Sequence, residues 1–117
     1  MKKIYHLSSC STCQRIIKEI NPDNSVDLQD IKVQNIDASM LDWIKDKVCS
    51  YEALFSKRAM KFRAMGLHEQ QLTDDDYRRL MLEEYTFLKR PFIILGDQVF
   101  IGNAKKDVEA AVKAFHS

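Results

Sequence analysis

Apolar residues near both ends of the chain are grouped in short runs of the kind found in β-strands. Residues 3–7 carry one such run and predict a first strand, and residues 26–31 predict a second. Farther along, residues 92–95 and residues 99–101 form two apolar runs on either side of a turn that contains Gly96. Two apolar runs joined by so short a connection predict a β-hairpin.

Segments with helical spacing separate these strands. Between residues 16 and 20, three isoleucines fall on one face of a helix, and Ser11 or Thr12 provides the cap that begins it. The turn-forming residues 21–24 end this helix. After the hairpin, residues 105–115 predict a closing helix.

The middle of the chain has no strand pattern and is predicted to be helical. Ser39 is expected to cap one helix, and further helical turns are expected over residues 51–55 and 59–65. Thr73 and the acidic residues that follow it combine a cap with the negative charge that favours a helix N-terminus. The helix that they begin is expected to extend as far as Tyr85.

The predicted order is strand, helix, strand, helical block, hairpin, helix, which is typical of an α/β protein. The length of 117 residues suits one compact domain with a single core. We therefore expect a single domain over residues 1–117, with a helical insert at about residues 38–86.

Composition and charge add mainly exclusions. Hydrophobic residues make up 45% and charged residues 30%, and the net charge of +1 gives no reason to expect binding to nucleic acid or to a membrane surface. No apolar run approaches the roughly 20 residues that cross a bilayer. The first residues lack the long apolar segment of a secretory signal, so we expect a cytoplasmic protein, with a monomer as the simplest assembly.

Candidate chemistry lies in a Cys-x-x-Cys motif. The chain has three cysteines, an odd number that does not suit a disulfide framework, and Cys10 and Cys13 stand directly before or within the first predicted helix. Unpaired N–H groups and the helix dipole at that position stabilise a thiolate, which is the nucleophilic form of cysteine. Cys13 lies one turn onward, where it is placed to attack an adduct at Cys10 and close a disulfide. Cys49 stands apart from the pair.

Three other interpretations stay open at this stage. Cys13 is also suited to be a small buried apolar residue on the helix face. A zinc site would need further ligands, but there is no second Cys-x-x-Cys motif and the histidines are scattered, so no metal is expected. The third interpretation is a Cys-x-x-Cys spacing that has arisen by chance. Redox chemistry is the leading hypothesis.

Basic residues form a second set of candidates. Arginine has a planar fork of donors that suits oxyanions, and positive charge also stabilises a thiolate. The candidates are Arg15, Lys57, Arg58 and Arg90, each of which has the alternative of being a solvated surface charge. Arg90 directly precedes Pro91 at the entry to an apolar strand, where the peptide bond is a candidate for the cis form.

Four segments together resemble one known family. They are residues 4–6 with the sequence Ile-Tyr-His, the motif Cys-Ser-Thr-Cys at 10–13, the basic segment 55–67, and residues 88–94 around the Arg-Pro pair. In this combination the chain resembles the family that joins the glutaredoxin-coupled arsenate reductases and the Spx redox regulators. The resemblance implies a thioredoxin-like mixed sheet flanked by helices, with a helical insert between its two halves. It also implies a cis Pro91 that faces the cysteine loop.

The two branches of this family imply different functions. In the arsenate-reducing branch, the first cysteine attacks arsenate, arginines hold the oxyanion, and glutathione with glutaredoxin resolves the adduct. In the Spx branch, the Cys-x-x-Cys pair is a disulfide switch in a regulator that contacts RNA polymerase.

We accordingly expect a thiol oxidoreductase that resembles arsenate reductase, without a bound cofactor, whose reductant is glutathione, glutaredoxin or another thiol donor. Cys10 is the expected nucleophile and Cys13 the resolving thiol. The expected oxyanion-binding residues are Arg90, Arg58 and Arg15, with Pro91 and Thr12 in structural roles at the site. The alternative is an Spx-like redox-switched regulator that binds a protein partner such as RNA polymerase.

The chain departs from the family pattern at positions that matter for this choice. Gln14, Ser56 and Gly102 stand where family members carry arginines, so Arg90 alone remains of the three-arginine oxyanion set. Cys13 stands where the arsenate reductases usually carry serine. The sequence therefore indicates the family but leaves the branch open.

Overall fold

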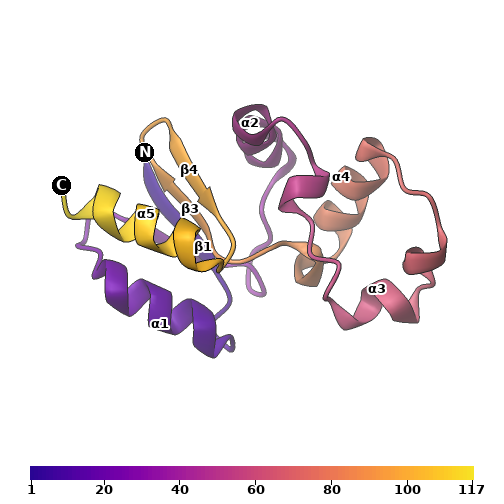
Figure 1. Cartoon of the computed structure of the whole chain (residues 1–117), viewed down its shortest axis with the longest axis horizontal. Helices are drawn as coiled ribbons and strands as arrows, with labels where there is room; N and C mark the ends of the chain where they lie inside the picture. The colour runs from indigo at the N-terminus through magenta and orange to yellow at the C-terminus, as the bar shows by residue number, and fades with distance from the viewer. The chain divides into compact units, whose positions relative to one another are not determined.

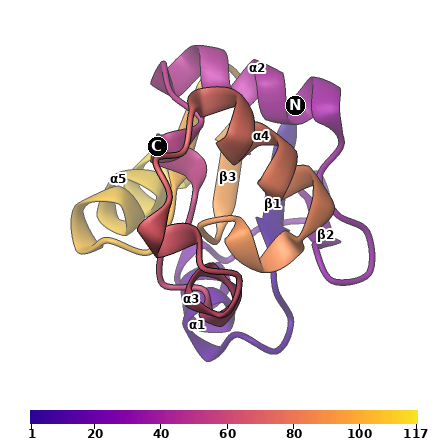
Figure 2. The ribbon, with the colours of Figure 1, turned by 90° about the vertical axis from the view of Figure 1, so that its right-hand side faces the viewer.

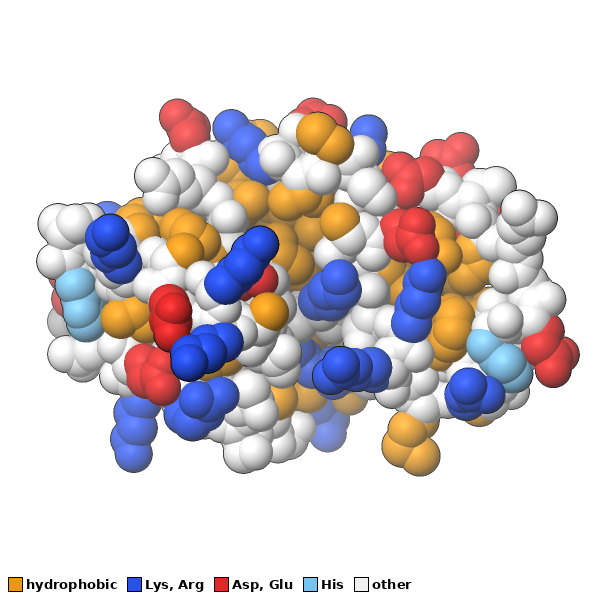
Figure 3. All heavy atoms as spheres, viewed as in Figure 1, with side chains coloured by type: hydrophobic (Ala, Val, Ile, Leu, Met, Phe, Trp, Pro, Cys, Tyr) orange, Lys and Arg blue, Asp and Glu red, His pale blue; other side chains and the backbone are white.

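The computed structural model describes all residues from Met1 to Ser117. The chain divides into two compact units, one made of residues 1–34 and 90–117 and the other of residues 35–89. None of the helices is long and apolar enough to cross a membrane. Basic and acidic side chains are interspersed on the face drawn in Figure 3.

The first unit contains a four-stranded mixed sheet with the strand order β2-β1-β3-β4. β1 pairs with β2 in parallel, whereas β1 with β3 and β3 with β4 are antiparallel. This confirms the predicted α/β fold with a mixed sheet and a β3–β4 hairpin. The elements of this unit, labelled in Figure 1, are β1 (Lys2–His6), α1 (Ser11–Ile20), β2 (Asp27–Asp30), β3 (Phe92–Leu95), β4 (Gln98–Ile101) and α5 (Lys105–Phe115).

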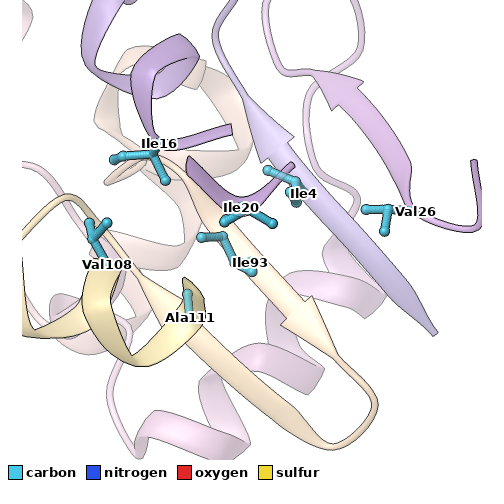
Figure 4. Close-up of a cluster of buried hydrophobic side chains, with 7 residues drawn as sticks. All are labelled: Ile4, Ile16, Ile20, Val26, Ile93, Val108 and Ala111. Carbon is cyan, nitrogen blue, oxygen red and sulfur yellow. The ribbon is translucent and has the colours of Figure 1, made fainter. Parts of the chain in front are cut away.

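An aliphatic core joins the sheet to the helices of this unit. Ile4 of β1 and Ile93 of β3 stand opposite each other in the sheet, and both are at most 1% exposed. α1 and α5 contribute apolar side chains to the same cluster, and Figure 4 shows these side chains facing the space between sheet and helices. Burial of each large aliphatic side chain contributes about 1.5–3 kcal/mol. The cluster consists of Ile4, Ile16, Ile20, Val26, Ile93, Val108 and Ala111.

The strand directions bring four chain segments to one edge of the sheet. β1 and β2 end at this edge because they are parallel, β3 begins there, and β4 ends there. The turn after β1, Asp30 at the end of β2, the Arg90–Pro91 pair and Gly102 therefore lie together. The N–H of Gly102 donates to the Pro91 carbonyl at 2.9 Å, and Gly102 has a φ of 82°, a conformation that favours glycine.

The second unit is entirely helical and is organised around Phe55. Its ring centroid lies 4.9 Å from those of Tyr77 and Phe87 and 5.9 Å from that of Phe62. These contacts join the middle of the unit to its end, and Figure 2 gives a second view of its helices. Its elements are α2 (Ala38–Val48), η1 (Glu52–Leu54), α3 (Met60–Ala64), η2 (Leu67–Glu69), α4 (Asp74–Glu83) and η3 (Tyr85–Phe87).

The structure corrects three helix boundaries. α2 is capped by Asp37, whose carboxylate accepts from the Met40 N–H at 2.8 Å, so Ser39 lies inside the helix. Tyr85 lies beyond the end of α4 in a separate short helix. α1 has Cys10 at its N-cap position and no side-chain cap, so neither Ser11 nor Thr12 plays that role. The Thr73 cap of α4 is confirmed.

Candidate functional site

A tight turn carries the chain from β1 into α1. The N–H of Cys10 donates to the Leu7 carbonyl at 3.0 Å, which closes the turn around Ser8 and Ser9. Cys10 has extended backbone angles, φ −91° and ψ 109°, and its carbonyl accepts from the Gln14 N–H at 3.1 Å. Cys10 is thus the last residue before the helix, at the place where helical N–H groups lack carbonyl partners.

The surroundings of Cys10 favour its thiolate. The side chain is partly buried, and this partial burial by itself raises the pKa of the thiol. Against this, the Cys13 N–H, the Cys13 thiol, the Thr12 N–H and the positive charge of Arg90 all lower the pKa. The net result is a pKa below the ordinary value for cysteine, so more of Cys10 is in the nucleophilic form at neutral pH.

Cys13 has the opposite character. Its side chain is fully buried, and this burial raises the pKa of the thiol to about 11. The neighbouring Cys10 acts in the same direction, because a negative charge there disfavours a second one and holds the Cys13 proton in a hydrogen bond. Cys13 is therefore a protonated donor to Cys10 as long as Cys10 is a thiolate.

Arg90 supplies the positive charge at this site. It lowers the pKa of both thiols, and its Nη1 atom is buried without a hydrogen-bond partner. The Arg90–Pro91 peptide bond is cis, as expected. A buried guanidinium nitrogen with a free donor is suited to an anionic oxygen, since such donors are costly to leave unpaired.

The structure adds four polar side chains that the sequence did not single out as a group. Gln14 donates from Nε2 to the Leu7 carbonyl at 3.2 Å, and the same atom lies 3.5 Å from Nδ1 of His6. The Ser8 hydroxyl donates to Oδ2 of Asp30 at 2.5 Å. Only the parallel register of β1 and β2, which local patterns do not encode, brings Asp30 beside this turn.

The other basic candidates and Cys49 are exposed. Arg15 lies on the exposed side of α1, where its Nη1 is 3.5 Å from Oε1 of Glu19. Arg58 is exposed and belongs to the helical unit. Cys49, also exposed, follows the end of α2 in the same unit. The site in the sheet unit thus consists of Cys10, Cys13, Thr12, Arg90 and Pro91.

The mixed sheet has an ionisable cysteine at the start of α1, a buried second cysteine one turn later and a cis proline at the same end of the sheet. Together these features define a protein of thioredoxin-like fold with a thiol site. The chain belongs to the ArsC family, whose model matches residues 5–111. Among curated proteins, none matches the sequence.

Several solved structures share this fold. A possible arsenate reductase from Streptococcus mutans is 26% identical, with a TM-score of 0.70 over 93% of this chain and 98% of that one. An arsenate reductase from Vibrio cholerae is 16% identical, with a TM-score of 0.76 over 96% and 95%. An arsenate reductase related protein from Brucella melitensis is 23% identical, with a TM-score of 0.69 over 93% and 92%.

Proposed function

We propose that this protein is a thiol oxidoreductase in which Cys10 is the nucleophile and Cys13 the resolving thiol. The observation that carries the proposal is the place of Cys10 directly before α1, with the fully buried Cys13 one turn onward and the unpartnered Nη1 atom of Arg90 at the same end of the sheet. In these surroundings the pKa is lowered at Cys10 and raised at Cys13. One thiol is prepared to attack, and the other is kept protonated until the first has reacted. Membership of the ArsC family supports the same chemistry.

The order of steps follows from the interaction between the thiols. When the Cys10 sulfur bonds to a substrate, it loses its negative charge, and both effects by which Cys10 raises the pKa of Cys13 disappear. Arg90 continues to lower that pKa. The Cys13 thiol can then give up its proton and attack the Cys10 sulfur, so that a disulfide forms and the substrate leaves with the electron pair of its bond to sulfur.

The proposed substrate is arsenate, as in the structural neighbours that are named arsenate reductases. The Cys10 thiolate attacks arsenic and displaces a hydroxide, and this hydroxide is protonated and leaves as water. Attack by Cys13 then returns the sulfur–arsenic electron pair to arsenic, so As(V) becomes As(III) and arsenite leaves. The Nη1 atom of Arg90 is the proposed donor to an arsenate oxygen. A thiol donor such as glutathione, with or without glutaredoxin, supplies the two electrons that reopen the disulfide, in the cytoplasm.

A single-turnover experiment tests this without the correct donor being known. The fully reduced protein is freed of reductant and mixed with excess arsenate, and arsenite and disulfides are measured. We expect about one arsenite per chain and a Cys10–Cys13 disulfide in the peptide map. Cys49→Ser should behave as the unmodified protein, whereas Cys10→Ser should yield no arsenite.

Two results would contradict the proposal at different points. A Cys10 that is alkylated no faster than Cys49 at pH 7 would refute the thiol mechanism. A reactive Cys10 that yields no arsenite would refute arsenate as the substrate. If peroxide still formed the Cys10–Cys13 disulfide in that case, the hypothesis of a redox-switched binding protein would replace that of a reductase.

A further inference from the structure

A side-chain hydrogen bond joins the end of β2 to the turn that carries Cys10. Ser8 is the first residue inside the Leu7–Cys10 turn, and its hydroxyl donates to Asp30, the last residue of β2. The 2.5 Å distance is short, as is usual when a hydroxyl donates to a carboxylate. This bond connects the cysteine turn to a strand that is distant in the sequence.

Asp30 is itself held in place. It stands opposite His6 in the parallel register, and the next residue, Ile31, donates its N–H to the His6 carbonyl at 2.9 Å. Oδ1 of Asp30 accepts from the Lys32 N–H at 3.0 Å, so each carboxylate oxygen has a donor. The Asp30 carbonyl also accepts from the N–H groups of Val33 and Gln34. The carboxylate is therefore a fixed acceptor rather than a mobile surface charge.

The other side of the turn is held by α1. Gln14 donates to the Leu7 carbonyl, which is the same carbonyl that accepts from Cys10. The turn is thus fixed at Leu7 by the helix and at Ser8 by β2. Cys10 follows directly, and its sulfur must be directed at the N–H groups of Thr12 and Cys13 for its thiolate to be stabilised.

We propose that Ser8 and Asp30 are positioning residues for Cys10. Their hydrogen bond holds the turn in the geometry that directs the Cys10 sulfur at the first N–H groups of α1. Neither residue touches the reacting sulfur. The inference rests on the proposed function in one respect, because it takes Cys10 to be the nucleophile.

The charge of Asp30 gives a way to separate positioning from simple electrostatics. A carboxylate near a thiolate disfavours it, so removal of that charge alone should make Cys10 more reactive. Loss of the hydrogen bond should make Cys10 less reactive. The other charged or titratable side chains that act on these groups are His6 on β1, Cys13 on α1 and Arg90 before β3, and the variants below leave all three unchanged.

The experiment is the pH profile of Cys10 alkylation by iodoacetamide, followed by mass spectrometry in the full chain. Ser8→Ala removes the donor and leaves the Asp30 charge, so we expect alkylation at pH 7 to slow about threefold and the profile to move to higher pH. Ser8→Thr keeps a hydroxyl and should restore the profile. Asp30→Asn keeps an acceptor oxygen and should react at least as fast as the unmodified protein.

A matched control lies on the same strand. Asp27 is the first residue of β2 and pairs with Lys3 at 3.1 Å, away from the turn, so Asp27→Asn should leave the profile unchanged. Circular dichroism confirms that each variant is folded. An unchanged profile in Ser8→Ala would overturn this inference while leaving the proposed function intact. A Cys10 that is unreactive in the unmodified protein would overturn both.

Discussion

Cys13 combines a position in the core with a chemical role, and the two make different demands on its thiol. Full burial keeps the group neutral, whereas attack on a sulfur requires a thiolate. The negative charge of the nearby Cys10 keeps the Cys13 thiol protonated before the first step. After that step the charge is gone, so the pKa of Cys13 falls and a thiolate can form. This timing depends on the charge of Cys10 and on its hydrogen bond with the Cys13 thiol.

Burial of Cys13 predicts a loss of stability at high pH. In the unfolded chain this thiol ionises above about 8.5, whereas in the folded protein it stays protonated until about pH 11. Between these values the folded state binds more protons, so the free energy of unfolding falls as pH rises. Urea denaturation at pH 7.5 and pH 10 measures this fall, which should be smaller in Cys13→Ser and unchanged in Cys49→Ser. An equal fall in all three proteins would contradict the prediction.

Arg90 is expected to control the reactivity of both thiols. Replacement of its charge in Arg90→Met should raise the pKa of Cys10 and slow alkylation at pH 7 by about three- to tenfold. Arg90→Lys should retain part of the effect, since the charge remains but the planar fork does not. Arg15→Met is the matched control, because Arg15 pairs with Glu19 on the exposed side of α1. An equal effect of both arginines would show that overall charge, not position, determines reactivity.

At the scale of elements, α1 and α4 begin in opposite ways. α4 has a complete capping box, in which the Thr73 hydroxyl accepts from the Asp76 N–H and the Asp76 carboxylate accepts from the Thr73 N–H. α1 has no side-chain cap, and the N–H groups of Thr12 and Cys13 lower the pKa of the Cys10 thiol instead. A helix without a side-chain cap is less stable, but its unpaired N–H groups can stabilise a negative charge.

The caps of α2 and α4 lead to a stability prediction. Thr73→Ala and Asp37→Ala each remove a side-chain acceptor at an N-cap and should lower the free energy of unfolding by about 1 kcal/mol. Ser39→Ala should change it much less, because Ser39 lies inside α2 and only its hydroxyl contacts Asp37. Urea denaturation monitored by circular dichroism measures all three. A larger loss in Ser39→Ala than in Asp37→Ala would contradict the observed cap.

The sequence predicted elements better than it predicted their contacts. The hairpin and α5 were predicted correctly because apolar runs on either side of a turn and helical spacing are local patterns. Two caps were misplaced, at α1 and α2, because several residues able to cap stand next to each other. The Ser8–Asp30 bond was not predicted at all, since it depends on which strands pair and in what register. The cysteines and the Arg-Pro pair could be chosen as candidates from the sequence because their chemistry is distinctive, and the predicted cis form of the Arg90–Pro91 bond is confirmed.

At the scale of the molecule, the helical unit depends on its aromatic cluster. Phe55 is 1% exposed and contacts Phe62, Tyr77 and Phe87. Phe55→Ala should therefore lower the free energy of unfolding by about 3–5 kcal/mol. Met60→Ala is the control, since Met60 is 91% exposed and should cost little. Thermal denaturation of the two variants gives the comparison, and similar melting temperatures would contradict this account of the core.

The pairing of β1 with β3 has a consequence for how the protein is made. Cys10 follows β1, whereas Arg90 precedes β3, and the whole helical unit is encoded between them. At a synthesis rate of about 5–20 residues per second, Cys10 is made roughly 4–16 s before Arg90. Throughout that interval the nascent chain lacks both the third strand and the arginine. Until Arg90 has been made, only groups within α1 lower the pKa of Cys10, and the charge of the arginine is added last.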